Sequence, residues 1–392
     1  MRTAYGLIFR PWDFIGEAGS LLDRALGEIG FDALIVPAVT GPQERFRPEP
    51  DSPPHTFMTE GGWHFPVRTD AYQTAAAKPR VAKWCGKRDV LEKIRNAAAQ
   101  RDVRLILEID LRAVDGLLEH EPHLRGRDAW GEVPAAAGPC VLNPDLRELL
   151  RATLADLARY EPAGWRLVDW MADLAPSGTP RTTFTWHPLL AQLLDVCFCP
   201  ACRQTAEARG VDPDAAAEAV RRMTASLMEE PTLDLSVLAS GNLREYLEVR
   251  RRDVADWLQR LGESFPGQNF HMRTPLRAVG DPWLLARTAF ELLPSAFMPV
   301  FAQPAFSPSF IPPPGVSAYG RTFPVWQPDF SQADALVKAV NAAAKGDAAA
   351  IDASSDSASH VAASLLEFEG LDTAPRAALD WLRLAVRYAR RG

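Results

Sequence analysis

The chain has 392 residues, of which 47% are hydrophobic and 24% are charged, and its formal net charge is −7. These values exclude a disordered or fibrous chain. The acidic balance argues against a nucleic-acid partner, because nucleic-acid-binding proteins usually carry a basic patch. The residue count allows two or three domains of roughly 150 residues each or a single α/β barrel with long loops.

The amino-terminal segment MRTAYGLIFRPWDF has neither the apolar core nor the small-residue cleavage site of a signal peptide. No apolar run approaches the roughly 20 residues that are needed to span a bilayer. We therefore expect a cytoplasmic protein with no membrane partner.

Strand-like and helix-like segments alternate along the chain. We expect strands at residues 3–11, 31–39, 103–111, 164–171, 268–275, 296–304, 316–323 and 345–354. The helices that separate most of them are expected at about residues 15–30, 88–102, 143–160, 203–227, 241–263 and 374–391. Asn143 and Pro144 have the residue types of a helix N-cap and a first helical turn.

Eight strands that alternate with helices indicate an α/β protein with a parallel sheet, and the number of units favours a (β/α)8 TIM barrel. No GxGxxG motif follows a strand and no Walker A sequence is present, so a nucleotide-binding fold has no support. We expect one domain over residues 1–392, with loop insertions at about residues 40–87, 112–142 and 172–202. These insertions follow strands and precede helices, which is where barrel enzymes build their active sites.

The five cysteines are unevenly distributed. Cys197, Cys199 and Cys202 form a C-x-C-x2-C motif, a spacing at which three thiolates converge on one ion. Zinc prefers four ligands in tetrahedral geometry, and an all-cysteine site leaves no position for water, so the zinc would be structural. Cys140 is the favoured fourth ligand, because the loops after the third and fourth barrel strands are neighbours. Cys85 is the alternative fourth ligand, and a further alternative is that the motif holds three partly buried free thiols without a metal.

The segments CVLNPDLREL, GWRLVDW and CFCPACR, in this order, resemble the family-42 glycoside hydrolases of the β-galactosidase type. The chain is also similar to a broad group of uncharacterised glycosidase-like barrels in GGWHFPVRTDAY, RDVLEKI, LLDVCFCPACR and NLREYLEVRRRDVADWL. The resemblance covers about residues 1–275 at the level of motifs. It implies the barrel fold and a structural zinc site more than it implies the reaction.

The sequence departs from family 42 at the catalytic positions. The resemblance implies an Asn-Glu pair at the end of the fourth strand, whereas this chain has Val168, Asp169 and Trp170 there. A nucleophilic glutamate is not evident near VSAYGRTFPVW either. The two-glutamate mechanism of the family therefore cannot be transferred to these residues.

Glycoside hydrolysis needs two carboxyl groups that flank the scissile bond. Asp169 is the first candidate, because it lies where the resembling enzymes place their acid/base. Asp110 and Asp352, each at a predicted strand end, are the expected partners, and Glu108 shares the face of Asp110 because side chains alternate along a strand. For each of them, capping a helix or pairing with an arginine is the alternative role.

Candidate substrate-binding residues lie at strand ends or in loops. The apolar faces of sugar rings pack on aromatic planes, and the polar candidates could bind hydroxyl or acidic groups. The set comprises Arg10, Trp12, Trp63, His64, Trp170, His271 and Arg273. No HxH or HExxH motif is present, so a catalytic metal is not expected.

The favoured function is a glycoside hydrolase that acts on a small-molecule or oligosaccharide substrate through paired carboxylates. One alternative is a saccharide-binding barrel without catalysis, which the missing glutamates suggest. Another is a sugar-acid isomerase or lyase, because arginine and histidine side chains at strand ends would suit an anionic substrate. Homo-oligomers are a further expectation, because related enzymes often associate.

Overall fold

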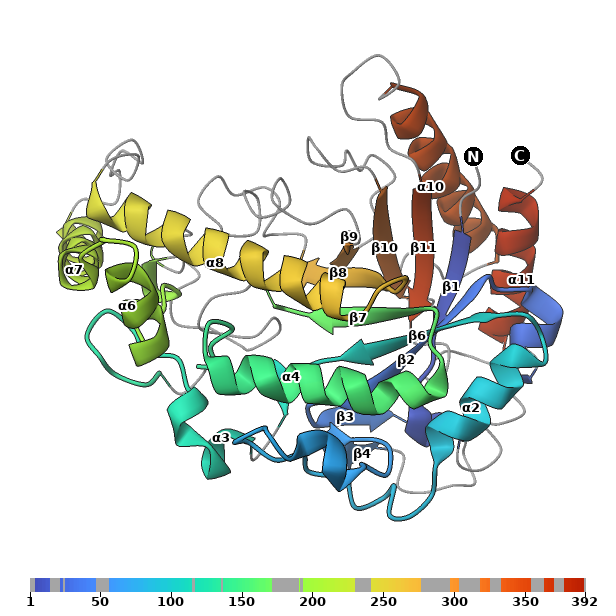
Figure 1. Cartoon of the computed structure of the whole chain (residues 1–392). Coiled ribbons are helices and arrows are strands. Elements are labelled where there is room, and N and C mark those ends of the chain that lie inside the picture. The colour runs from blue at the N-terminus through green and yellow to red at the C-terminus, as the bar shows by residue number, and fades with distance from the viewer. Residues whose placement is uncertain are drawn as a thin grey trace.

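The computed structural model describes residues 4–14, 22–23, 25–46, 56–114, 117–134, 137–170, 190, 193–229, 241–275, 297–302, 318–324, 333–353, 363–369 and 377–390. Within these residues the chain forms an α/β fold around a curled sheet (Figure 1). Across the described part of the chain, no helix has both the length and the apolar character needed to cross a membrane.

The main sheet consists mostly of parallel strands. Its described strands are β1 (Ala4–Ile8), β2 (Ala33–Thr40), β5 (Gly62–Trp63), β6 (Arg104–Ile109), β7 (Gly164–Val168), β8 (Asn269–Pro275), β9 (Phe297–Ala302), β10 (Ala318–Pro324) and β11 (Ala363–Glu369). They lie in the order β1-β11-β10-β9-β8-β7-β6-β2-β5, and β1 also pairs with β2. Every pairing is parallel except the short antiparallel contact of β5 with β2. The sheet thus resembles that of a TIM-like barrel.

Among the described connections, α-helices lie between β2 and β6, β6 and β7, β7 and β8, and β10 and β11. The described α-helices are α2 (Val90–Ala99), α3 (Leu117–His120), α4 (Pro144–Leu157), α6 (Pro200–Glu207), α7 (Pro213–Glu229), α8 (Asn242–Ser264), α10 (Ala333–Ala353) and α11 (Ala377–Ala389). In Figure 1, α4 and α8 run along the strands β6 to β8, and α10 and α11 lie beside β11 and β1. The predicted cap of α4 is confirmed, because the Asn143 side chain accepts a hydrogen bond from the Asp145 amide.

Alternation along the strands separates two buried surfaces. Leu105 and Leu107 of β6 belong to the large apolar cluster that also contains the buried residues of α2 and α4. Ile106, between them, belongs instead to a small separate cluster with Ile8, Ala33 and Ile35. Because successive side chains of a strand point to opposite faces, this small cluster marks the inner face of the curled sheet.

Two of the expected insertions contain structure of their own. The described residues of the range 40–87 include the antiparallel pair of β3 (Gln43–Phe46) and β4 (Thr56–Thr59), together with β5 and a short 3-10 helix at Thr69–Tyr72. The segment 112–142 contains α3 and the short 3-10 helices Leu111–Ala113 and Pro122–Leu124. Most of the insertion at 172–202 lies outside the described residues.

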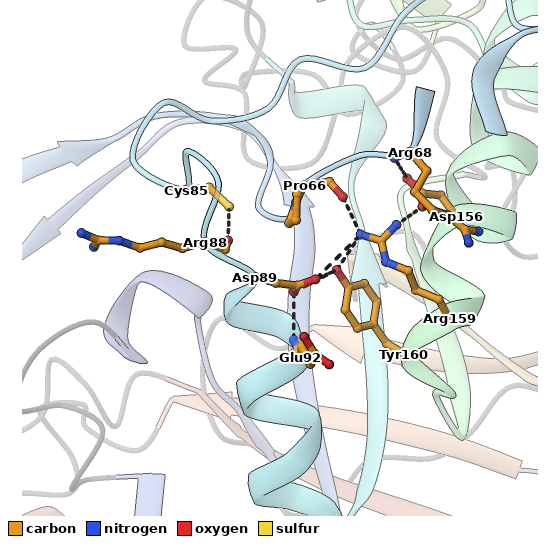
Figure 2. A network of polar contacts seen from close by, with 9 residues as sticks. All are labelled: Pro66, Arg68, Cys85, Arg88, Asp89, Glu92, Asp156, Arg159 and Tyr160. Carbon is orange, nitrogen blue, oxygen red and sulfur yellow. Dashed lines mark hydrogen bonds and ion pairs between the residues drawn. The ribbon is translucent and has the colours of Figure 1, made fainter. Parts of the chain in front are cut away.

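A polar network anchors the first insertion to α4 (Figure 2). The guanidinium of Arg159 contacts the Asp156 carboxylate, the Pro66 carbonyl and the Tyr160 hydroxyl. The Asp156 side chain is fully buried and also accepts a hydrogen bond of 3.0 Å from the Arg68 amide. A buried carboxylate is costly unless it is paired, so these contacts fix the segment around Pro66 to the end of α4.

The same network reaches α2. The Tyr160 hydroxyl lies 2.8 Å from a carboxylate oxygen of Asp89, and Asp89 caps α2 by accepting a hydrogen bond from the Glu92 amide. Figure 2 also shows Cys85, whose thiol donates a hydrogen bond to the Arg88 carbonyl. Burial raises the pKa of the Cys85 thiol to about 11, so this cysteine is a protonated thiol close to the start of α2.

The prediction of a last strand at residues 345–354 is wrong. Residues up to Ala353 belong to α10, and the strand that follows is β11, which the sequence reading did not predict. Alanine is the strongest helix former, and the alanine-rich run before Asp352 extends the helix. Asp352 therefore lies in a helix and not at a strand end, which removes the reason for placing it beside the other carboxylates.

Candidate active site

The inner face of the sheet changes from apolar to charged along its strands. Glu108 of β6 lies opposite Arg166 of β7, and Arg166 lies opposite His271 of β8. Paired residues on neighbouring strands point to the same face, and Glu108 shares the face of Ile106 by alternation. The charged layer therefore lies on the carboxyl-terminal side of the apolar cluster, at the end of the sheet where barrel enzymes carry their active sites.

Glu108 is held by two arginines. Its carboxylate lies 3.3 Å from Arg166 Nη1 and 3.5 Å from Arg273 Nη1. The Arg166 side chain is fully buried and that of Glu108 nearly so. A buried charge needs a partner, so Glu108 has the pairing role that the sequence analysis gave as the alternative to catalysis.

Asp110 has the most unusual carboxyl group of the described chain. Burial, the negative charge of Asp169 and that of Glu108 raise its pKa from 3.8 to about 7. The Ala113 amide donates a hydrogen bond of 3.1 Å to Asp110 Oδ1 and opposes this shift. Asp110 keeps some solvent exposure. Near neutral pH both its protonated and its ionised form are therefore populated.

Asp169 follows β7 in a conformation that is uncommon for a residue with a side chain. Its φ angle is 57°, in the left-handed region, and it is 3% exposed. Its amide donates a hydrogen bond of 3.0 Å to the Arg273 carbonyl, and its own carbonyl accepts one of 2.9 Å from Arg112. Backbone strain of this kind persists where the surroundings hold it, often at functional sites.

His64 belongs to an aromatic group beside the end of β2. Its ring lies edge-on to Trp12, with centroids 4.9 Å apart, and 5.5 Å from the ring of Trp84. The Thr40 hydroxyl donates to the Gly41 carbonyl and lies 2.8 Å from His64 Nε2. Because that hydroxyl has one proton, Nε2 donates to it and Nδ1 carries the lone pair. Burial lowers the pKa of His64 to about 3, so the ring is neutral at physiological pH.

The structure brings some of the other sequence candidates to the charged layer and not others. Arg10 is buried just after β1, and His271 is 8% exposed with a pKa lowered to about 3 by burial and by Arg166. Trp63 is fully buried, and its indole donates to Thr153 of α4 on the outer face. Trp170 is also fully buried and stacks on Trp257 of α8. Neither tryptophan presents a surface to a sugar here.

Four buried cysteines form a separate cluster. The sulfur atoms of Cys140, Cys197, Cys199 and Cys202 all lie within 4.8 Å of one another. The Sγ atoms of Cys140 and Cys202 are 3.4 Å apart. A tetrahedral zinc with bonds of about 2.3 Å needs sulfur atoms roughly 3.8 Å apart, so the group fits such an ion. Cys85 is not part of it.

The surroundings of the cluster favour a thiolate at Cys140, whereas burial and the neighbouring thiols raise the pKa of Cys197 and Cys202 well above their ordinary values. Hydrogen bonding from the other three thiols and the charge of Arg250 lower the pKa of Cys140 well below its ordinary value. Arg250 is itself buried on α8. The Tyr246 hydroxyl donates a hydrogen bond of 2.8 Å to the Cys197 carbonyl, and its ring stacks on Phe198. A metal held here would tie the loop around Cys140 to the start of α6 and to α8.

Arg112, Arg166 and Trp84 were not predicted from the sequence as residues of this site. Arg166 carried a usable signal, because an arginine within the apolar run GWRLV of a buried strand requires a buried partner. Arg112 lies in the short 3-10 helix Leu111–Ala113 and Trp84 in a turn, and their spacing to the other residues of the site shows no pattern in the sequence. Only the packing of the loops brings them there.

No protein-family model matches the sequence, and the search of curated proteins found no significant match. Solved structures do match. One is a β-galactosidase from the Antarctic haloarchaeon Halorubrum lacusprofundi, with a TM-score of 0.50, 13% identity and coverage of 98% of this chain and 58% of that chain.

Two further structures have TM-scores of 0.49. One is the α-L-fucosidase isoenzyme 2 from Paenibacillus thiaminolyticus, at 13% identity over 99% of this chain and 49% of that chain. The other is a β-galactosidase from the psychrophilic Marinomonas ef1, at 10% identity over 98% of this chain and 59% of that chain. The chain thus spans about half to three-fifths of the length of these structures. At such identities the similarity concerns architecture alone, namely an α/β fold around a curled parallel sheet.

Proposed function

We propose that the chain is a glycoside hydrolase built as one (β/α)8 barrel, with Asp110 and Asp169 as its paired carboxylates. The observation that carries the proposal is the pKa of Asp110, which burial and the charge of Asp169 raise to about 7 at the end of β6. Two carboxyl groups whose surroundings push their protonation apart are the usual basis of acid and base roles in glycoside hydrolysis.

Asp110 acts as the general acid in this proposal, since its raised pKa leaves a proton available near neutral pH for the departing glycosidic oxygen. Asp169 is the partner that supports positive charge at the sugar or attacks it, directly or through water. Glu108 holds Arg166 and Arg273 in place. The substrate contacts proposed for Arg10, Trp12, His64, His271 and Arg273 come from the same end of the sheet.

Family 42 offers a partial precedent for these roles. The motifs that resemble the family would place Asp169 at the position of the family's acid/base glutamate. The aspartate side chain is one methylene group shorter than that glutamate. The raised pKa of Asp110 favours a division of labour different from that of the family. We therefore propose the hydrolytic class and not the family's two-glutamate mechanism.

We also propose that the four-cysteine cluster binds a structural zinc ion. Four sulfur ligands fill a tetrahedral coordination sphere and leave no position for a reacting water. The cluster lies in the loops that follow β6 and β7, so the bound ion would stabilise the segments that carry Asp110 and Asp169 without taking part in the reaction.

The test uses paired substrates with good and poor leaving groups, such as 4-nitrophenyl and methyl glycosides across common sugars. Loss of a general acid costs typically 10²–10⁴-fold, and the loss is smaller when the leaving group needs no proton. Asp110→Asn should therefore lose more activity on methyl than on nitrophenyl glycosides. Asp169→Asn should lose activity on both.

The matched control is Asp256→Asn on α8, where the half-exposed carboxylate pairs with Arg209, and it should keep wild-type activity. Asparagine also tolerates the left-handed backbone of residue 169, so loss of activity in Asp169→Asn would not result from misfolding. Wild-type rates in both Asn variants at the site would overturn the proposal.

A second class of reaction has one observation in its favour. Arg166, His271 and Arg273 lie together at the strand ends, and such side chains suit a sugar acid. A uronate that is isomerised or eliminated without addition of water would indicate the isomerase or lyase. Glycan binding without any turnover by the wild type would instead indicate a saccharide-binding barrel.

A further inference from the structure

Arg112 joins the two halves of the site described above. It is buried, with 3% exposure, in the short 3-10 helix Leu111–Ala113 that follows β6. Its Nη1 donates a hydrogen bond of 2.9 Å to the Asp169 carbonyl, and its Nε donates one of 3.2 Å to the Pro139 carbonyl. One planar guanidinium thus spans two loops that follow different strands.

Both acceptors have functional neighbours. Pro139 directly precedes Cys140, one of the four clustered cysteines. Asp169 has the left-handed backbone and depends on its surroundings to keep it. The turn that carries Arg112 is itself capped by Asp110, which accepts a hydrogen bond from the Ala113 amide. Hydrogen bonds and the covalent backbone together therefore connect the segment of Cys140 to the Asp169 carbonyl and to the Asp110 carboxylate.

We propose that Arg112 is a positioning residue that couples metal binding at the four-cysteine cluster to the backbone conformation of Asp169. The proposal rests on the proposed function in assigning Asp169 a role in the reaction. A metal ion in the cluster fixes Cys140 and thereby the Pro139 carbonyl. Arg112, held by that carbonyl, then keeps the Asp169 carbonyl in the orientation that its φ of 57° requires.

The chemistry of the guanidinium explains why arginine is needed. Its donors have a fixed, planar geometry that can serve two acceptors in different directions, whereas the ammonium of lysine is a compact charge on a flexible stem. Arg112→Lys keeps the charge and loses the simultaneous contact with both carbonyls. It therefore separates the effect of positioning from the effect of charge.

The Asp169 amide provides a direct reporter. It donates a hydrogen bond to the Arg273 carbonyl, so its hydrogen exchange is slow as long as this backbone conformation is kept. The first experiment measures amide exchange by mass spectrometry in the wild-type chain after chelation and again after addition of zinc. Zinc should slow amide exchange around Cys140 and also at residues 168–170. At residues 168–170 the slowing should be on the order of tenfold, which corresponds to the net contribution of one hydrogen bond.

Two variants and a control complete the test. In Arg112→Met and Arg112→Lys, zinc should still slow exchange around Cys140 but should no longer change exchange at residues 168–170. Arg127→Met is the matched control, because Arg127 is an exposed arginine of the same insertion that binds a carbonyl within its own loop. It should behave like the wild type.

We expect the substitution of Arg112 to affect kcat and KM differently. Arg112→Lys should lower kcat with little change in KM, because the substrate contacts stay in place while Asp169 is displaced. The coupling would be overturned if the chain took up no zinc. It would also be overturned if amide exchange at residues 168–170 of the wild type were the same with and without zinc. The exchange measurement does not depend on turnover, so failure of the hydrolase proposal would leave its result interpretable.

Discussion

Replacing Asp110 with asparagine should stabilise the protein above neutral pH while it impairs the reaction. The raised pKa means that the folded state disfavours the charged carboxylate, because burial and the charges of Asp169 and Glu108 oppose ionisation. The uncharged amide of asparagine avoids this cost. The asparagine side chain still has an oxygen that can accept the hydrogen bond which the Ala113 amide donates to Asp110 Oδ1 in the wild type.

The magnitude follows from the pKa. Each tenfold change in a protonation equilibrium corresponds to about 1.4 kcal/mol. Raising the pKa of Asp110 from 3.8 to about 7 therefore corresponds to an upper limit of roughly 4 kcal/mol in the free energy of unfolding. Solvent contact of the partly exposed side chain reduces this value, and we expect a gain of about 2 kcal/mol for Asp110→Asn at pH 8, from partial screening.

The sign is set by which state binds the proton. Below the unfolded pKa of Asp110 both states are protonated, and the carboxyl group adds no pH dependence. Between that value and the folded pKa of about 7 the folded state binds more protons, so the wild-type free energy of unfolding falls as pH rises. The advantage of Asp110→Asn should therefore grow across this window and level off above it.

Urea unfolding followed by tryptophan fluorescence at pH 5 and pH 8 measures the effect, with Asp256→Asn as the control. Other titrating groups cancel in the difference between variant and wild type to the extent that they do not interact with Asp110. An equal difference at the two pH values would refute the reasoning, because it would mean that Asp110 ionises in the folded protein as it does in water.

Three further outcomes follow from the structure. The rate constant kcat/KM on a methyl glycoside should decline as pH rises through the folded pKa of Asp110, about 7, and pH-independent rates up to pH 9 would contradict its role as the acid. Arg159→Met should lower the free energy of unfolding by about 2 kcal/mol, because it removes a charged partner of the buried Asp156. The exposed Arg151→Met should cost under about 1 kcal/mol, and equal losses in urea unfolding would argue against the network. Cys140→Ser should abolish tight zinc uptake in elemental analysis and lower the Tm, whereas retention of one zinc per chain would exclude Cys140 as a ligand.

Local patterns in the sequence predicted the elements whose formation depends on nearby residues. The apolar runs of β6 and β7 and the Asn143 cap of α4 appear where they were expected. The segment before Asp352 was ambiguous, because a short apolar run of alanines suits a buried strand or a helix. Only the structure shows that this segment continues the helix α10 up to Ala353.

The carboxylates illustrate what no local pattern contains. The sequence placed Glu108, Asp110 and Asp169 at strand ends, but it did not predict which of these carboxyl groups has a raised pKa. In the structure Glu108 forms ion pairs with Arg166 and Arg273, and Asp110 is desolvated next to Asp169. These differences arise from charges on other strands and from exclusion of water. Both effects depend on residues that are distant in the chain.

By itself the sequence determined the alternation of elements and the C-x-C-x2-C motif, because hydrophobic period and ligand spacing are local properties. Tertiary structure decided that Cys140 and not Cys85 joins the cluster, and that Trp63 and Trp170 face helices. It also decided that Arg112 spans two loops. Each of these results depends on how strands lie side by side in the sheet, since that packing brings together residues that are distant in the chain.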